Sequence, residues 1–179
     1  MKHNKGFLFV FLFSLFWAID TIISKYAFNQ GMNPYVFSYQ SLILSAIGLL
    51  IYSKKTKAKF TKKHVKYMIF LGILANGIGS LFSAYGLKLS NSTNYGFLIK
   101  TTLIFAIVFS TILLKEKITS KKIGFGLLLL FGAYLISTAG MNLIPNPGDI
   151  FIIIAAGFYS LVSILSKKMK LPTLKSRVS

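Results

Sequence analysis

The sequence contains no cysteine, only three acidic residues and only two histidines among its 179 residues. The missing cysteines exclude disulfide bonds, thiolate metal sites and cysteine catalysis. His3 and His64 lie among lysines, and we find no acid–base pair, metal cluster or nucleophile constellation. We therefore expect no catalytic residue, no metal and no cofactor. An enzyme is the poorest of the functional classes that the sequence leaves open.

Charged residues of both signs together are also scarce. They make up 13% of the chain, whereas a soluble domain carries about 25%. Hydrophobic residues reach 54% and aromatic residues 15%, which places the chain in a lipid bilayer. The net charge of +18 would by itself also fit a nucleic-acid-binding protein. The distribution of the basic residues along the chain has to decide between these two classes.

Six long apolar segments follow one another along the chain. Crossing about 30 Å of hydrocarbon takes about 20 helical residues. The last segment is the weakest, because Ile150–Leu165 holds only 16 uncharged residues, and it needs local thinning of the bilayer or snorkelling by Lys167. The sequence therefore predicts an all-α integral membrane protein with about six transmembrane helices. The segments lie near residues 7–26, 35–53, 66–87, 95–114, 122–140 and 149–166.

The basic residues lie mostly at alternate ends of these segments. The N-terminus, the second-to-third connection, the fourth-to-fifth connection and the tail together hold 18 of the 21. Because short basic loops stay on the cytoplasmic side, we expect a multi-pass protein of the cell membrane with a cytoplasmic N-terminus and tail. A nucleic-acid groove would instead gather basic and aromatic residues on one surface. We therefore expect the lipid bilayer, and no nucleic acid, as a partner.

The last apolar segment repeats the beginning of the chain, because residues 148–168 match residues 6–26 at a constant offset of 142. Internal symmetry of this kind is common in transporters. Five segments precede the restart, so the second copy enters the membrane from the opposite face. We predict a five-helix repeat at 7–140, the first helix of an inverted second repeat at 148–168, and a polar cytoplasmic tail at 169–179. The identical pairs are Gly6 and Gly148, Phe9 and Phe151, Phe16 and Phe158, Ser24 and Ser166, and Lys25 and Lys167.

Two charged residues lie at membrane depth, Asp20 in the first segment and Lys100 in the fourth. Such charges cost about 2.5–3.5 kcal/mol each and usually face the bundle interior or water. Both residues lie at a similar depth toward the outer face, so one hypothesis pairs them or places both on one cavity. In the alternative, Lys100 snorkels to the outer headgroups and Asp20 is capped by neighbouring hydroxyls.

Three segments carry stripes of small or polar residues at helical spacing. Small residues let helices approach closely in lipid, so packing is the main role that we expect of them. The stripes are Ser14, Trp17, Thr21 and Ser24; Ser38, Ser41, Ser45 and Gly48; and Gly72, Asn76, Gly79, Ser83 and Gly86.

A solute site in such a protein is mostly apolar, with a few polar or aromatic groups that orient the ligand. The side chains that could offer such groups at membrane depth come from the first four segments. The candidates for a substrate cavity are Trp17, Asp20, Gln40, Asn76, Tyr95, Lys100 and Thr102.

Glu116 lies where the fourth segment meets the cytoplasm, just before Thr119 or Ser120, the expected N-cap of the fifth. A carboxylate near a helix start is favourable by about 0.3–1 kcal/mol. We interpret Glu116 as structural. Gly124 and Gly132 follow on a membrane helix without a preceding strand, so we interpret them as packing glycines and not as a phosphate loop.

Residues 92–137 resemble the most recognisable part of the EamA domain of the drug/metabolite transporter superfamily. In that family a span ends in leucine-x-glutamate, a basic residue and a hydrophobe, and a glycine-rich span follows. The matching positions are Leu114, Glu116, Lys117, Ile118, Gly124 and Gly132, and in the opening of the chain Trp17, Lys25 and Pro34.

Two positions depart from the family pattern. Gln40 replaces a frequent arginine of the second span, which removes any ion pair that the arginine would form. Leu103, beside Thr102, replaces a proline that commonly interrupts the fourth span, which predicts a straighter fourth helix.

The resemblance implies a ten-span transporter of two inverted repeats, in which a small metabolite or drug crosses a central cavity by alternating access. On that plan the chain holds one repeat and one further helix, so we expect an incomplete or truncated transporter of an unknown small solute. The alternative is an accessory subunit that does not transport alone. A second copy or a complementary half-transporter is then a partner. The uneven distribution of the basic residues argues against a dual-topology dimer.

Overall fold

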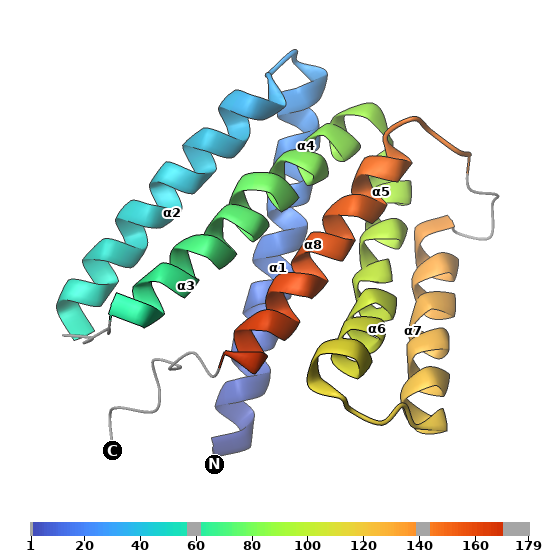
Figure 1. The fold of residues 1–179 in the computed structure, drawn as a ribbon. Coiled ribbons are helices and arrows are strands. Elements are labelled where there is room, and N and C mark those ends of the chain that lie inside the picture. Colours follow the sequence, from blue (N-terminus) through green and yellow to red (C-terminus); the bar gives the residue numbers. More distant parts are fainter. Residues whose placement is uncertain (1, 57–61, 139–143, 170–179) are drawn as a thin grey trace.

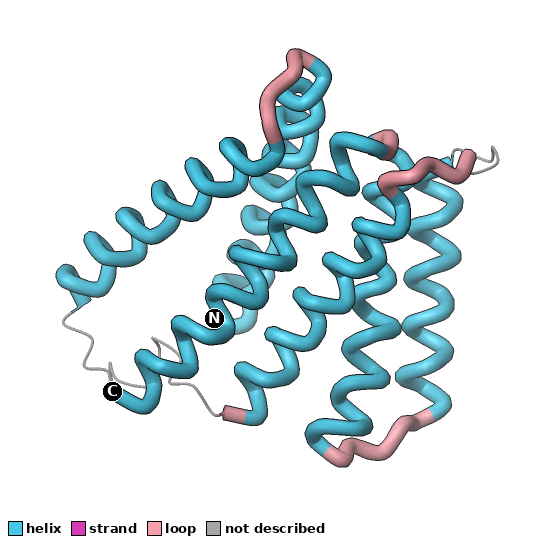
Figure 2. The backbone as a smooth tube through the Cα atoms, turned by 45° about the horizontal axis from the view of Figure 1, so that its top comes forward, coloured by secondary structure: helices cyan, strands magenta, loops and turns pink. Residues whose placement is uncertain are grey.

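The computed structural model describes residues 2–56, 62–138 and 144–169, and within these ranges it consists of helices and their connections without a strand (Figures 1 and 2). All but Met169 of the expected tail lies outside the described residues. The elements are α1 (Lys2–Asn29), α2 (Pro34–Thr56), α3 (Lys62–Gly72), η1 (Ile73–Gly79), α4 (Ser80–Leu89), α5 (Ser92–Leu98), η2 (Ile99–Thr101), α6 (Thr102–Leu114), α7 (Ser120–Thr138) and α8 (Asp149–Lys168).

The predicted membrane helices are present. Together α3, η1 and α4 make one continuous rod, the third span, and α5, η2 and α6 make the fourth span. With α2, of 23 residues, the described part contains the six expected helices, which confirms an all-α integral membrane fold. Within the described ranges, five helices are long and apolar enough to cross a membrane: Gly6–Asn29, Val65–Leu89, Ser92–Leu114, Ser120–Thr138 and Asp149–Lys168.

Two spans depart from regular α-helix. Ile73–Gly79 is a π-helical stretch in the middle of the third span, and Ile99–Thr101 is a 3₁₀ turn in the fourth. The fourth span, for which the missing proline predicts a straighter helix, thus contains one 3₁₀ turn directly before Thr102. The hydroxyls of Thr101 and Thr102 donate to Leu98 O and Ile99 O at 2.7 and 2.6 Å, so this turn is accompanied by local hydrogen bonds.

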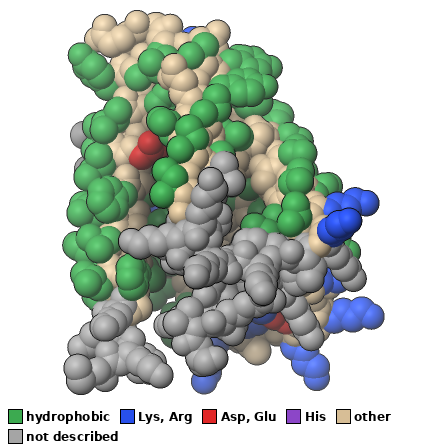
Figure 3. All heavy atoms as spheres, turned by 90° about the vertical axis from the view of Figure 1, so that its left-hand side faces the viewer, with side chains coloured by type: hydrophobic (Ala, Val, Ile, Leu, Met, Phe, Trp, Pro, Cys, Tyr) green, Lys and Arg blue, Asp and Glu red, His purple; other side chains and the backbone are tan. Residues whose placement is uncertain are grey.

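The connections alternate between two ends of the bundle, as the basic clusters predict. The starts of α1 and α3, the α6–α7 connection and the end of α8 lie at the lower end in Figure 1, and the other connections lie at the upper end. Most of the lysine and arginine side chains visible in Figure 3 lie toward that lower end, with hydrophobic side chains above them. The lysine-rich segments among the described residues thus share one end of the molecule.

Helix α8 is the most deeply embedded element of the described part. It lies between the third span and α6 in both ribbon views (Figures 1 and 2). Ile152, Ala155, Ala156 and Ser160 on α8 are fully buried. The core thus forms where α8 meets α4 and α5. Its buried cluster comprises Phe28, Ala84, Leu87, Tyr95, Ile99, Ile152 and Ala156.

Glycines allow α4 and α8 to meet backbone against backbone. A Cβ on Gly86 would lie 2.6 Å from Ile152 Cγ1, and a Cβ on Gly148 would lie 2.5 Å from Gly86 O. Farther down, a Cβ on Gly79 would lie 3.1 Å from the Tyr159 ring. The packing interpretation of the third-span stripe is therefore right for its glycines at 79 and 86.

The glycines of the fifth predicted span behave differently. A Cβ added to Gly124 or Gly132 would meet no atom within 4 Å among the described residues, whereas a Cβ on Gly126 would lie 3.5 Å from Ile107 Cδ1, in ordinary contact. The reason is that α7 lies at the edge of the bundle and contacts mainly α5.

Asp149 ties the upper end of α8 to two connections. Its Oδ1 accepts from the Ser90 hydroxyl at 2.5 Å, and its Oδ2 accepts from Asn94 Nδ2 and the Asn146 backbone N–H, both at 2.9 Å. Asn94 is buried and also donates to Ile144 O at 2.8 Å. The α4–α5 and α7–α8 connections therefore share one carboxylate.

Glu116 ties the lower end of α8 to α7. Lys115, in the left-handed conformation with φ 54°, ends α6, and Glu116 follows it. The carboxylate of Glu116 pairs with Lys167 Nζ at 2.6 Å and with Lys122 Nζ at 3.2 Å. The hydrogen bond from Lys167, and to a smaller extent the one from Lys122, holds the pKa of Glu116 below its ordinary value. The predicted cap is also present, because the Lys122 N–H donates to Thr119 Oγ1 at 3.4 Å.

Candidate functional site

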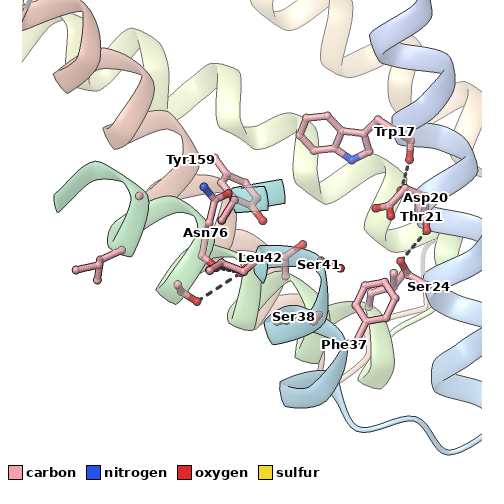
Figure 4. Close-up of a pocket in the computed structure, with 18 of the residues that line it drawn as sticks. Trp17, Asp20, Thr21, Ser24, Phe37, Ser38, Ser41, Leu42, Asn76 and Tyr159 are labelled. Carbon is pink, nitrogen blue, oxygen red and sulfur yellow. Dashed lines mark hydrogen bonds between the residues drawn. The ribbon is translucent and has the colours of Figure 1, made fainter. Parts of the chain in front are cut away.

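A cavity of about 1010 Å³ lies between α1, α2 and the third span, and Tyr95 of α5 and Tyr159 of α8 close one side of it (Figure 4). Ligand sites usually measure about 300–1,000 Å³, so this cavity is large enough for a small organic molecule. Most of its lining is apolar. Hydroxyl groups of α1, α2 and α4 and one amide, Asn76, supply polar atoms.

The structure brings four of the seven predicted cavity residues together. Trp17 and Asp20 come from α1, Asn76 from η1 and Tyr95 from α5. Trp17, Asp20 and Asn76 point into the same space in Figure 4. These four candidates share the cavity with most members of the predicted stripes on α1, α2 and the third span, including Thr21, Ser24, Ser38, Ser41, Gly72 and Ser83.

The other three candidates, Gln40, Lys100 and Thr102, do not line this cavity. Gln40 is exposed on α2, between the lining residues Ser38 and Ser41, because successive helical residues point about 100° apart. Lys100 is exposed on the 3₁₀ turn, and the Thr102 hydroxyl is bound to its own helix at Ile99 O.

The predicted pair of Asp20 and Lys100 is also absent. No ion pair joins them in the described part of the chain, where Glu116 makes the two salt bridges found, and only Asp20 of the two lines the cavity. The two side chains are separated because Asp20 faces α2 and the third span, whereas Lys100 lies on the α5 side of the bundle and is exposed.

The hydroxyls beside Asp20 do not cap its carboxylate, contrary to the second hypothesis. Thr21 Oγ1 donates to Trp17 O at 2.9 Å and Ser24 Oγ donates to Asp20 O at 2.6 Å, so both bind the backbone of their own helix. Among the described residues, the Asp20 carboxylate has no hydrogen-bond or ion-pair partner. It lines the same cavity as Tyr95 and Tyr159.

Lys25 lies one turn beyond Asp20 but is held away from it. Its ammonium donates to Leu87 O at 2.8 Å, to Lys88 O at 3.3 Å and to Ser90 O. These carbonyls form the C-terminal end of α4, where a cation is favourable. Lys25 therefore binds α1 to α4, and Asp20 is the one charged side chain among the described residues that line the cavity.

Tyrosines form the wall of the cavity nearest to α5 and α8. Tyr95 is only 6% exposed, and its hydroxyl lies 2.7 Å from Ser83 Oγ. A buried hydrogen bond therefore links α5 to α4. Sequence reasoning missed Tyr159. Its place among apolar residues of the last segment gives no sign of a cavity, and only the packing of α8 against the third span brings it there.

The π-helical stretch places Asn76 on the cavity side of the third span. Ser80 Oγ donates to Asn76 O and, at 3.5 Å, to Gly77 O, within the irregular region. Short π-helical insertions occur frequently at functional sites. Within the described residues, no group of three potential His, Cys, Asp or Glu ligands occurs that could hold a metal ion.

Comparison with known proteins matches residues 4–138 to the EamA-like transporter family, which is three-quarters of the chain. The chain belongs to this family. The resemblance seen in the sequence is thereby confirmed, and the protein is a multi-pass membrane protein of a transporter family. No solved structure gives a significant match.

Three curated relatives are similar over most of the chain. An uncharacterized transporter of Clostridium kluyveri is 28% identical over 92% of this chain and 57% of its own length. A WAT1-related protein of Arabidopsis thaliana is 28% identical over 84% and 44%. The riboflavin transporter ImpX of Fusobacterium nucleatum is 26% identical over 94% and 60%. The chain thus spans about half the length of the relatives that it matches.

Proposed function

We propose that this EamA-like chain carries a small solute across the cell membrane by alternating access through the cavity beside Asp20. The observation that supports this most is the composition of the cavity lining, in which a carboxylate, an amide and hydroxyls face an otherwise apolar space between membrane helices. Sites for small molecules have this composition. The π-helical stretch at Asn76 supplies an irregular segment in the wall of the cavity.

We also propose that residues 148–168 begin a second, inverted repeat after a five-helix repeat at 7–140. In Figure 1, α1 rises and α8 descends, and an inverted repeat needs such opposite directions. The lysine-rich connections at one end of the bundle support a cytoplasmic N-terminus and tail.

A second candidate is a subunit that needs a partner, either another copy or a complementary half-transporter. In its favour, none of the 18-residue apolar window of α1 is buried. The chain also spans only 44–60% of the length of its relatives. In this case the cavity would become a solute path only within the assembly.

Solute flux into proteoliposomes tests the proposal. A solute panel that includes riboflavin, for which one relative is named, is offered to the protein and to two amide-to-leucine variants. We expect Asn76→Leu to lower flux about tenfold, because an amide that lines the cavity and can hydrogen-bond a solute is lost. Gln40→Leu, the matched change outside the cavity, should stay within about twofold of the unchanged protein.

Equal flux through both variants would contradict a path along the cavity. Absence of flux from the chain alone, with flux restored by a complementary half-transporter, would favour the partner-dependent subunit.

A further inference from the structure

The described lining of the cavity carries a negative charge and no positive one. Among the described residues that line it, Asp20 is the one ionisable acid or base apart from the tyrosines, and none is a lysine or an arginine. We propose that the cavity binds organic cations, which pair with the Asp20 carboxylate and lie against an aromatic wall. The inference rests on the proposed function only in treating this cavity as the solute site.

The carboxylate is available to a cationic ligand. Lys25, one turn away on α1, is bound to the carbonyl oxygens at the end of α4. Lys100 lies outside the cavity. The hydroxyls of Thr21 and Ser24 donate to backbone carbonyls of α1 and not to the carboxylate. Among the described lining residues, an anion would meet the unpaired carboxylate without a compensating basic group, so this lining disfavours anionic ligands.

The aromatic wall suits a cation with an apolar body. Trp17 lies one turn from Asp20 on α1, with its ring edge-to-face with Phe13 at a centroid distance of 5.3 Å. Phe28, about two turns beyond Asp20 on α1, and Phe37 on α2 form a second edge-to-face pair at 5.2 Å. Rings of this kind attract cations that lose their water, with tryptophan the strongest. The wall and the carboxylate together are the chemistry that recognises amines and quaternary cations.

A pair of ions with the same shape and opposite charge tests the inference. Tetraphenylphosphonium and tetraphenylborate are titrated against the protein in nanodiscs of zwitterionic lipid, with empty nanodiscs subtracted. Binding is measured by equilibrium dialysis and by the fluorescence of Trp17, the single tryptophan of the chain, which lines the cavity. We expect saturable binding of the cation that changes Trp17 emission, and no saturable binding of the anion.

Two variants that each remove one negative charge separate the site from the general charge of the protein. Asp20→Asn should weaken tetraphenylphosphonium binding at least tenfold, whereas Asp20→Glu should retain it. Glu116→Gln, which lies in the α6–α7 connection and not in the cavity, should change it less than twofold. An Asp20→Asn variant that binds the cation as tightly as the unchanged protein, or saturable binding of both ions alike, would overturn the inference.

The inference and the proposed function can fail separately. Charge-selective binding that depends on Asp20, without flux of any solute, supports the inference and counts against autonomous transport. Flux of a neutral solute that tetraphenylphosphonium does not inhibit, with Asp20→Asn fully active, supports transport and overturns the cation site.

Discussion

Replacing Gly148 with alanine is expected to lower the melting temperature of the protein by about 2–12 °C. The added methyl carbon would lie 2.5 Å from Gly86 O, 2.6 Å from the Ser90 nitrogen and 2.7 Å from the Leu89 carbonyl carbon. These are backbone atoms and cannot rotate away, so α8 has to move off α4. Overpacking of this kind costs about 1–3 kcal/mol, and each kcal/mol shifts the midpoint by about 2–4 °C at this chain length.

Gly124→Ala is the matched control, because the same methyl group meets no atom within 4 Å there. Alanine also has the higher helix propensity, by up to about 1 kcal/mol, so this variant should be unchanged or slightly more stable. Thermal unfolding of both variants in the same detergent gives the comparison. Equal melting temperatures for the two variants would mean that α4 and α8 do not meet at these glycines.

Replacing Asp149 with alanine is expected to cost about 2–4 kcal/mol of unfolding free energy. The carboxylate accepts three hydrogen bonds, from Ser90, Asn94 and the Asn146 backbone. Asn94 is 2% exposed, so the amide hydrogen that binds Asp149 would be left without an acceptor away from water. Each buried polar group left unsatisfied costs about 1–3 kcal/mol.

Asp149→Asn is the intermediate variant, because its single amide oxygen can accept only some of the three hydrogen bonds that the carboxylate accepts. Denaturant titration in micelles should therefore order the stabilities as unchanged protein, then Asp149→Asn, then Asp149→Ala. An alanine variant as stable as the unchanged protein would contradict the role of this carboxylate in joining the two connections.

The spans and the N-cap of α7 could be predicted from the sequence because they depend on local pattern. Runs of about 20 apolar residues set the helices, and Thr119 stands directly before α7 as a hydroxyl acceptor. Lysine-rich and lysine-poor connections alternate along the chain, and this alternation predicted which connections share one end of the bundle.

The cavity was predicted only in part, because helical position and depth do not fix which neighbour a side chain meets. Asp20 and Lys100 were expected at a similar depth, yet they face different sides of the bundle. Gln40 lies between the lining residues Ser38 and Ser41 in the chain, but its side chain points from a different face of α2. The irregular turns at 73–79 and 99–101 leave no sequence mark such as proline, so the register through them was not predictable.

The role of Asp149 was missed for a related reason. Its side-chain partners Ser90 and Asn94 lie 59 and 55 residues away in the chain. Only the packing of α8 against α4 and α5 brings these residues together. An acidic residue in the first turn of a helix already has a local explanation in the helix dipole, which conceals the longer-range contacts.

The central claim, that the cavity beside Asp20 is a solute path open in turn to both sides, can be tested by cysteine labelling. The chain has no native cysteine, so Ser41→Cys in the cavity and Ile136→Cys, at an 85% exposed position on the apolar α7, each provide a single thiol. A membrane-impermeant thiol reagent is applied to vesicles of each orientation. We expect the thiol at 41 to react from both sides, with the ratio of the two rates shifted by a transported solute, and the thiol at 136 to react from neither. Reaction at 41 from one side only, whatever solute is added, would contradict alternating access through this cavity.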